Sequence, residues 1–390
     1  MRKRVLLYQH KYNGESCRNG KNMPCKEKGL HKGGFYMGLI HSYALWNNKG
    51  GVGKSTITFH LSMRYAELHP EQNVLVIDLC PQANSSMMLL GGGPIGEENI
   101  ISFCKEATPH SVVGYLSTVI TNGRGAELPD PYNFVVNVSD YNKNAPQNLH
   151  LLCGDGNLEP MAPAINEAAS AKALTPSAQP WKWIQEIIKN FIEKITSSEK
   201  EWMVFIDTNP SFSIYTQIAI SGAERLLTPI NADDSSKTAA SAMVALLHGT
   251  NPPHPIYGSW TYAKMAEEQG IEVPKIHLLI GNRLTQFKGS ATAFKALSDA
   301  TSTSLYKIYA EHPEYFVEAT EDIDSKEKFI EYYSKPLRDF NSAGVVCAHL
   351  GRLLSSMKQG YYPVYSENAK VNAEKIKECK NAIDEIIVKL

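Results

Sequence analysis

Two hydrophobic patterns alternate along this chain. Strands rich in apolar residues are predicted at residues 39–46, 74–79, 149–152, 202–207, 225–230 and 275–280, and residues 74–79 form a nearly continuous apolar run. Between several of them helices are predicted, as in residues 55–68 and in residues 181–195, where apolar residues recur at the spacing of a helix. A short continuous apolar run is typical of a central strand covered on both faces. The alternation predicts an α/β fold with a doubly wound, mostly parallel sheet, helices on both faces, and ligands at the carboxyl ends of the strands.

Two stretches depart from this pattern. Residues 91–148 are rich in turn signals, apart from a predicted helix near residues 112–120, and residues 160–180 are rich in Ala, Pro and Ser. We therefore expect an irregular insertion over about residues 91–180, within a main domain of residues 37–360. Near the end of this domain, residues 343–357 are predicted to be helical.

Residues 361–390 are predicted to form a C-terminal linker and a helix. The helix, over about residues 371–390, has apolar residues on one face, and its acidic and basic side chains nearly cancel. Helices that bind membrane surfaces usually carry a clear basic excess and bulky aromatic residues. The pattern favours docking on the domain, or pairing with a partner helix, over membrane binding.

The first 36 residues differ from the rest in charge. They hold nine Lys and Arg residues and two Glu residues, and they lack hydrophobic periodicity, so we expect a disordered basic tail over residues 1–36. The tail is either a basic arm for DNA or an upstream extension, because Met37 stands just before the first predicted strand. The whole chain has a formal net charge of −1, so its overall charge gives no support for nucleic-acid binding by the main domain.

Composition bears on whether the protein spans a membrane, is secreted or contains disulfides. The sequence has no run of about 18 apolar residues that would span a membrane. Its N-terminus lacks the apolar core of a secretion signal. Seven cysteines, an odd number scattered over 390 residues, favour reduced thiols in the cytoplasm over a disulfide framework.

The strongest chemical signal lies between the first predicted strand and the first predicted helix. Residues 45–56 read Leu-Trp-Asn-Asn-Lys-Gly-Gly-Val-Gly-Lys-Ser-Thr. Glycines let successive backbone N–H groups face one anion, which a helix N-terminus also attracts. In such a phosphate loop, Lys54 would reach the β- and γ-phosphates and the Ser55 hydroxyl would bind Mg²⁺. The predicted nucleotide-binding residues of the loop are Gly50, Gly51, Val52, Gly53, Lys54, Ser55 and Thr56.

Lys49, directly before two glycines, resembles the signature lysine of the deviant-Walker ATPases, which include ParA partition proteins, MinD and nitrogenase iron protein. The chain is most similar to the ParA proteins within this ParA/MinD type. The resemblance implies a P-loop NTPase fold, ATP and Mg²⁺ as cofactors, and a homodimer that forms on ATP binding. In that dimer Lys49 would touch the phosphates bound by the other subunit. The alternative is an ordinary loop lysine.

Residues 76–84 resemble the switch segment of ParA proteins, which usually reads Asp-x-Asp-Pro-Gln-Gly-Asn. Asp78 matches the first aspartate, which lies near the metal and the nucleophilic water. Cys80 stands in place of the second, which the family uses in hydrolysis. Because a neutral thiol orients water less well than a carboxylate, we expect slow ATP hydrolysis.

Residues 204–211 look like a Walker B strand. An aspartate at the end of a buried strand is costly unless it serves a metal or a hydrogen-bond network. Asp207 would hold Mg²⁺ through water, although it could instead cap a helix. Asn282, at the end of a later strand, resembles the residue that reads the adenine edge in MinD-like proteins. The implied catalytic residues are Lys49, Lys54 and Asp78, and the implied metal ligands are Ser55, Asp78 and Asp207.

The resemblance implies an ATP-dependent dimerising switch that serves plasmid or chromosome partition. It would act with a ParB-like activator and bind DNA non-specifically, in the cytoplasm and on the nucleoid. The main alternative is a MinD-like spatial regulator, or a defence or signalling ATPase, that binds proteins instead of DNA. A metabolic ATP-dependent ligase of the same superfamily is a third class, which the ParA-like switch segment disfavours.

Overall fold

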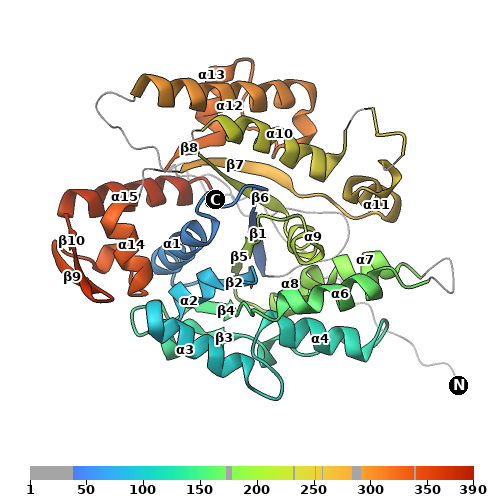
Figure 1. Cartoon of the computed structure of the whole chain (residues 1–390), viewed down its shortest axis with the longest axis horizontal. Coiled ribbons are helices and arrows are strands. Elements are labelled where there is room, and N and C mark those ends of the chain that lie inside the picture. Colours follow the sequence, from blue (N-terminus) through green and yellow to red (C-terminus); the bar gives the residue numbers. More distant parts are fainter. Residues whose placement is uncertain are drawn as a thin grey trace, which may run out of the picture. The chain divides into compact units, whose positions relative to one another are not determined.

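The computed structural model describes residues 38–172, 178–231, 233–250, 252–256, 258–282, 291–337 and 340–390. The basic tail expected over residues 1–36 lies outside the described residues. Among the described residues, eight strands form one sheet in the order β3-β4-β2-β5-β1-β6-β7-β8, and only the β3–β4 pair is antiparallel (Figure 1). The strands are β1 (Leu39–Leu45), β2 (Asn73–Leu79), β3 (Val136–Asn137), β4 (Leu149–Leu152), β5 (Trp202–Thr208), β6 (Arg225–Asn231), β7 (Lys275–Asn282) and β8 (Ser334–Pro336).

The predicted doubly wound, mostly parallel sheet is confirmed, and its strands bury both faces. In β2, Val74 and Val76 belong to one apolar core, while Leu75, Ile77 and Leu79 belong to the other. Successive side chains of a strand point to opposite faces, so a strand covered on both sides must be apolar at every position. This is why the sequence shows continuous apolar runs.

Helices cover both faces of the sheet (Figure 1). One core contains residues of α1 (Lys54–Leu68), α2 (Asn84–Leu89), α3 (Gly93–Cys104), α5 (Val138–Tyr141), α14 (Asn341–His349) and α15 (Ala373–Ile387). The other contains residues of α4 (Val112–Asn122), α6 (Leu158–Ala169), α7 (Pro180–Gln185), α8 (Ile187–Ile195), α9 (Ile214–Ser221), α10 (Asp234–His248), α11 (Tyr262–Gln269), α12 (Ala291–Glu311) and α13 (Lys326–Tyr333). Short 3-10 helices lie at Pro131–Asn133, Gly258–Trp260, Pro313–Tyr315 and Leu354–Ser356.

Residues 91–180 are more regular than their turn signals suggested. Instead of an irregular insertion, the described part of this stretch contains α3, α4 and α6, together with β4 inside the main sheet. Helix α6 forms although Pro163 lies inside it and has no N–H to donate. Its buried residues Leu158, Ile165 and Ala169 pack into the core. Burial of this apolar side therefore outweighs the low helix propensity of proline.

The predicted helix over residues 343–357 ends early. Helix α14 stops at His349, and Gly351 follows with φ +57°, in the left-handed region that favours glycine. The N–H of Arg352 donates to the Cys347 carbonyl at 2.9 Å. This is the pattern by which glycine commonly ends a helix. The expected C-terminal linker is likewise more ordered, because β9 (Gly360–Val364) and β10 (Glu367–Val371) form an antiparallel hairpin before α15.

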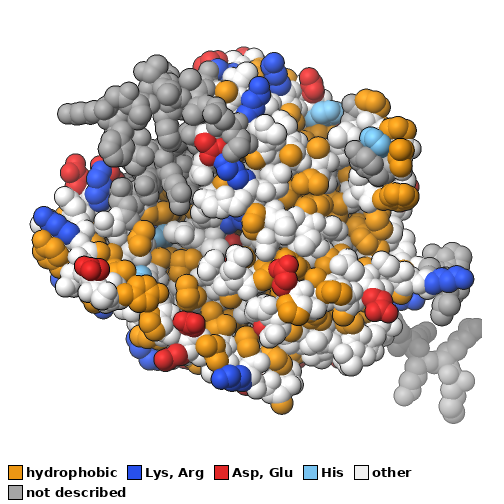
Figure 2. Space-filling model, in the orientation of Figure 1, with side chains coloured by type: hydrophobic (Ala, Val, Ile, Leu, Met, Phe, Trp, Pro, Cys, Tyr) orange, Lys and Arg blue, Asp and Glu red, His pale blue; other side chains and the backbone are white. Residues whose placement is uncertain are grey.

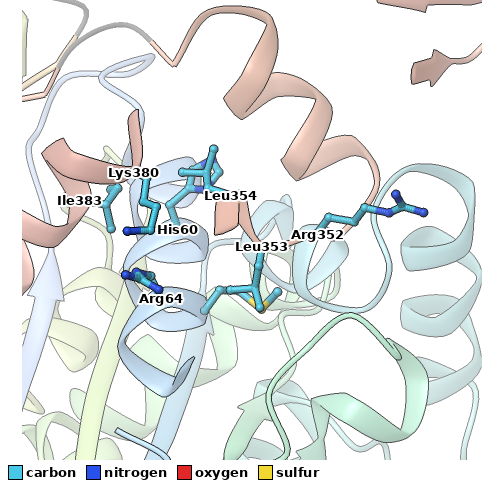
Figure 3. Close-up of a pocket in the computed structure, with 8 residues that line it drawn as sticks. His60, Arg64, Arg352, Leu353, Leu354, Lys380 and Ile383 are labelled. Atoms are coloured by element: carbon cyan, nitrogen blue, oxygen red, sulfur yellow. The ribbon is translucent and has the colours of Figure 1, made fainter. Parts of the chain in front are cut away.

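Helix α15 docks on α1 of its own domain, one of the two expected alternatives. Arg64 of α1 binds the Asp384 carboxylate through two nitrogens, at 2.7 and 3.1 Å. Figure 3 shows His60 and Arg64 of α1 beside Lys380 and Ile383 of α15. These residues line a space of about 10 Å³, roughly that of one water molecule. Within the described ranges, no helix is both long enough and apolar enough to cross a lipid bilayer.

Candidate nucleotide-binding site

The strand order brings the predicted site residues together at one edge of the sheet. Strand β5 lies between β1 and β2, so the carboxyl ends of these three parallel strands are adjacent. Asp207 of β5 is the register partner of Asp78 in β2 and of Leu45 in β1, from which the glycine loop departs. The loop, Asp78 and Asp207 therefore lie close together, although Asp78 is 29 positions and Asp207 is 158 positions after residue 49 in the sequence.

The loop backbone requires glycine at two positions. Gly51 and Gly53 have φ values of +71° and +87°, in the left-handed region that other residues reach only at a cost. Gly53 is the N-cap of α1 and supplies no side chain to cap it. The first turn of α1 is therefore capped by no side chain, the arrangement that binds an anion at a helix N-terminus. Ser55 and Thr56 lie in this turn, Val52 is buried and Gly50 is exposed.

Lys54 curls back over its own loop. Its side chain is buried, and its ammonium donates to the carbonyls of Asn47 at 3.1 Å and Lys49 at 3.0 Å. Burial lowers the pKa of Lys54 to about 8, although Asp207 and Cys80 act in the opposite direction. The ammonium is held where its charge can meet an anion bound by the loop.

Lys49 is engaged within the same chain. Its ammonium binds the carboxylate of Asp233, with 2.5 Å to Oδ1. Asp233 is also the N-cap of α10, where it accepts from the N–H of Ser236 at 3.0 Å. Asn47 joins the two segments, because its Oδ1 accepts from the Lys49 N–H and its Nδ2 donates to the Pro229 carbonyl at the end of β6. Both residues lie in segments that resemble ParA loops in the sequence, but no role for the side chain of Asp233 or Asn47 was predicted from it.

Asp78 is fully buried and held by three hydrogen bonds. Its Oδ1 accepts from the Cys80 N–H at 3.0 Å, and its Oδ2 accepts from the N–H and hydroxyl of Ser86 at 3.0 and 2.7 Å. Burial raises the pKa of Asp78, while the hydrogen bonds from Ser86 lower it. A side chain at Gly154 would come within 2.9 Å of the Asp78 carboxylate, so the loop after β4 closes tightly on this aspartate.

Asp207 is also fully buried, but one of its oxygens has no hydrogen-bond partner. Its Oδ1 accepts from the Thr208 N–H at 3.0 Å, whereas Oδ2 is unpartnered among the described residues. Burial and then the charge of Asp78 raise the pKa of Asp207 to about 7, against the effect of Ser55, Ser85 and Lys54. The next helix, α9, has Ser213 as its N-cap, so Asp207 does not cap it. An orphaned carboxylate oxygen fits a cation better than a structural role.

Cys80 is a buried, neutral thiol. Burial, followed by the charges of Asp78 and Asp207, raises its pKa to about 12, and its sulfur lies 3.5 Å from Gln82 Oε1. Ala83 follows with φ +48°, at the position of glycine in the ParA switch pattern. A non-glycine residue in this conformation costs roughly 1–3 kcal/mol. The switch segment is therefore held under backbone strain next to the two aspartates.

Asn282 lies farther from the loop than the other predicted residues. It is the last residue of β7 and pairs with Asn231 of β6, which separates β7 from β1. The side chain of Asn282 lies outside what the structure describes, so its contact with a base stays a prediction.

The fold and this site define a P-loop ATPase of the ParA/MinD type. The chain belongs to the AAA domain family, whose model matches residues 41–250. A comparison with curated proteins gives no match.

Two solved structures of McdA show the same fold at low sequence identity, and a third solved structure is more distantly similar. McdA from Cyanothece, without nucleotide, is 16% identical, with 88% of this chain and 99% of McdA covered and a TM-score of 0.51. An ATP complex of a McdA variant is 16% identical, with 90% and 97% covered and a TM-score of 0.51. A plasmid partition protein from Borrelia burgdorferi is 15% identical, with 90% and 99% covered and a TM-score of 0.45.

Proposed function

We propose that this protein binds Mg-ATP at residues 49–56, dimerises around it, and hydrolyses it slowly to reset the dimer. The observation that carries the proposal is the orphaned Oδ2 oxygen of Asp207, which is buried beside Asp78. Asp207 lies at the carboxyl end of β5, and β5 is the neighbour of β1 in the sheet. Strand β1 leads into the glycine loop, in which Gly51 and Gly53 have left-handed backbone conformations. A cation site beside an anion site is what a magnesium-bound nucleotide needs.

The loop supports binding of the triphosphate. Its backbone N–H groups and the N-terminus of α1 would hold the phosphates, and Thr56 would contact the α-phosphate. The Lys54 ammonium would exchange the carbonyls of Asn47 and Lys49 for phosphate oxygens. This exchange replaces neutral acceptors by charged ones, which makes stronger hydrogen bonds.

Ser55, Asp78 and Asp207 supply the oxygen atoms that Mg²⁺ prefers. Ser55 and Asp207 would hold the ion directly or through water, and Asp78 would hold the water molecules around it. When bound, the ion neutralises charge that develops on the transferred phosphoryl group. Its presence would also lower the pKa of Asp207, because a cation favours the ionised carboxylate.

Dimerisation would be the switch. The resemblance gives Lys49 a contact with the phosphates of a second copy, and in the single chain Lys49 instead binds Asp233. The two partners compete for one ammonium, so ATP would favour the dimer by offering Lys49 a more strongly charged partner than Asp233.

The ParA-like switch segment favours DNA partition as the task, with a ParB-like activator, in the cytoplasm and on the nucleoid. The alternative is a MinD-like or signalling ATPase whose partners are proteins. On the face in Figure 2, basic and acidic side chains are scattered among apolar ones, so a DNA contact there would be a local patch. DNA binding by the ATP form that weakens steeply with salt would favour partition. Absence of any DNA binding would favour a protein partner.

The test of nucleotide binding is titration calorimetry with Mg-ATP. We expect Lys54→Ala to weaken binding by about 10- to 100-fold, because it removes charge-assisted hydrogen bonds worth about 1.5–3 kcal/mol. Lys264→Ala, which removes an exposed lysine of α11, is the matched control and should bind as the parent does. Equal affinity of the Lys54 variant and the parent would refute the phosphate-loop assignment.

A further inference from the structure

A cavity of about 320 Å³ lies away from the nucleotide loop, at the other end of the sheet. It is lined by Lys275, the first residue of β7, and by residues of α12, α13 and the segment 312–325 that joins them. These two helices lie beyond β7 at the top of Figure 1. Because β7 is parallel to the central strands, its amino end is opposite the carboxyl ends that carry Asp78 and Asp207. The volume is within the range of ligand sites, about 300–1,000 Å³.

Aromatic rings from three segments form one wall of this cavity. The ring centroid of Tyr309 in α12 lies 5.3 Å from that of Phe316 and 5.5 Å from that of Tyr333 in α13. The Tyr333 hydroxyl donates to the Val317 carbonyl at 2.6 Å, and the Val317 N–H donates to the Ile276 carbonyl of β7 at 3.0 Å. These bonds tie the wall to the sheet. Phe316 and Tyr333 are buried and Tyr309 is only partly buried, so Tyr309 is the ring most open to a ligand, and aromatic faces attract cations.

Carboxylates form the rim of the same cavity. The acidic residues that line it are Glu314, Glu318, Glu321 and Asp322. Residues 311–324 hold six Asp and Glu residues and no Lys or Arg, although the whole chain has a net charge of only −1. Glu314 is paired with His312 at 3.0 Å. The other three are exposed and, in the part of the chain that the structure describes, have no salt-bridge partner. Their negative charge is therefore available to a ligand.

The charge and the rings together define the class of ligand. Carboxylates without a basic partner repel phosphate groups and favour a cation. A guanidinium group can stack on an aromatic ring while it donates to carboxylates, and the apolar part of an arginine side chain packs on apolar residues such as Ile323. Lys275 also lines the cavity, but its single ammonium is outnumbered by the four carboxylates. The exposed carboxylates are spread along residues 318–322, so neighbouring basic residues of an extended segment can each meet one.

We propose that this cavity binds an arginine-containing basic segment of a partner protein. One guanidinium would lie beside Tyr309, and the neighbouring basic residues would follow the carboxylates of the rim. The inference goes beyond the proposed ATPase function, because the cavity and the nucleotide loop are at opposite ends of the sheet. Binding of the segment therefore requires no nucleotide, and the chain can hold this partner while ATP occupies the other end.

The experiment measures binding of a short fluorescent peptide, in which arginine alternates with glycine and serine, to the full chain without nucleotide. Fluorescence anisotropy gives its dissociation constant. A matched peptide with citrulline, a neutral isostere, in place of each arginine should bind at least about tenfold more weakly. Glu318→Gln/Glu321→Gln should weaken binding of the arginine peptide about 5- to 30-fold. Tyr309→Leu should weaken it about 3- to 10-fold, whereas Lys275→Met should strengthen it about twofold, because a like charge is removed.

The control is the double variant Glu97→Gln/Glu98→Gln. It removes two exposed carboxylates of α3, which lies far from α12 and α13 in Figure 1, and its affinity for the peptide should stay within about twofold of that of the parent. An equal loss of affinity in the two double variants would overturn the inference, since binding would then depend on net charge alone.

Unchanged affinity in Glu318→Gln/Glu321→Gln would also overturn the inference. So would displacement of the fluorescent peptide by spermidine at a lower concentration than by the unlabelled peptide, because the cavity would then be a site for a free polyamine. The two glutamates are exposed, so their substitution tests binding whether or not Tyr309→Leu lowers the melting temperature.

Discussion

Lys54 shows how one buried side chain couples nucleotide binding to pH. Its pKa is lowered to about 8 by burial in the free protein, and phosphate charge would raise this pKa in the complex. Above about pH 8, binding must therefore be accompanied by proton uptake. Because the free protein then lacks the proton that the complex needs, affinity falls as pH rises.

We expect the dissociation constant for Mg-ATP to rise by up to about tenfold per pH unit above pH 8, and to change little from this group near pH 7. Calorimetry at pH 7, 8 and 9 measures both the affinity and the proton uptake. Lys54→Arg is the control, because a guanidinium stays protonated and the dependence should disappear. A constant affinity from pH 7 to pH 9 would contradict the proposed contact between Lys54 and the phosphates.

Cys80 sets the expected rate of hydrolysis. Its pKa is raised to about 12, so the thiol carries no charge at neutral pH. We expect Cys80→Asp to raise steady-state ATPase turnover by at least about tenfold, since positioned proton-transfer groups contribute about 10²–10⁴-fold. Cys80→Ser, which stays neutral, should remain within a few-fold of the parent. Rapid ATP turnover by the parent would contradict this prediction if Cys80→Asp left the turnover unchanged or lowered it. The thiol would then not slow hydrolysis.

At the scale of elements, α1 connects the nucleotide-binding loop to the C-terminal helices. Its N-terminus forms the end of the glycine loop, and its side packs against α14 and α15. His60 lies in this packing, fully buried and stacked on Phe340 at a centroid distance of 4.3 Å. The C-terminal helix is thus fastened to the helix that begins at the site.

Burial lowers the pKa of His60 to about 3, below its usual value of 6.5. The neutral side chain therefore stabilises the fold fully above pH 6.5, and this contribution is lost as pH falls from 6.5 towards 3. From pH 7 to pH 5 the loss should be about 2 kcal/mol in the free energy of unfolding.

His60→Phe keeps an aromatic ring at this position and removes the titrating group. Between pH 7 and pH 5, the free energy of unfolding of the variant should therefore fall by about 2 kcal/mol less than that of the parent. Urea unfolding at the two pH values measures the difference between variant and parent. Other, partly buried histidines, His150 and His277 among them, have lowered pKa values of about 4 and remain in both proteins. An equal loss in both proteins would mean that His60 is protonated without cost.

At the scale of the molecule, we predict that the protein changes from a monomer to a dimer when it binds ATP. We expect Lys49→Ala to bind nucleotide nearly as the parent does and yet to stay monomeric with a non-hydrolysable ATP analogue. Asp233→Asn should do the opposite and dimerise at lower protein concentration, because Lys49 loses its charged partner in the same chain. Asparagine still caps a helix, so α10 should remain intact.

Light scattering across a concentration series measures both variants against the parent. Dimerisation of Lys49→Ala as strong as that of the parent would rule out the role of Lys49 across the interface. An Asp233→Asn protein that dimerises like the parent would show that the ion pair does not compete with the dimer.

The sequence by itself determined the central strands and the loop, because each is dictated locally. A strand buried on both faces needs an apolar residue at every position, as in β2 and β5. A loop that turns through left-handed conformations needs glycine, as at Gly51 and Gly53. Asp207 could be found in the same way, because a carboxylate that ends a buried strand is conspicuous, whereas Asp78 was predicted from its match to the ParA switch segment.

Only the tertiary structure decided which residues complete the site and which irregular-looking segments become ordered. Asp233 reaches Lys49 because β6 lies beside β1, and no local pattern encodes this order. Helix α6 forms in spite of Pro163 because the core supplies an apolar surface for its buried side. Long-range packing outweighs local propensity wherever the free energy of burial is larger, and the sequence pattern alone does not measure that free energy.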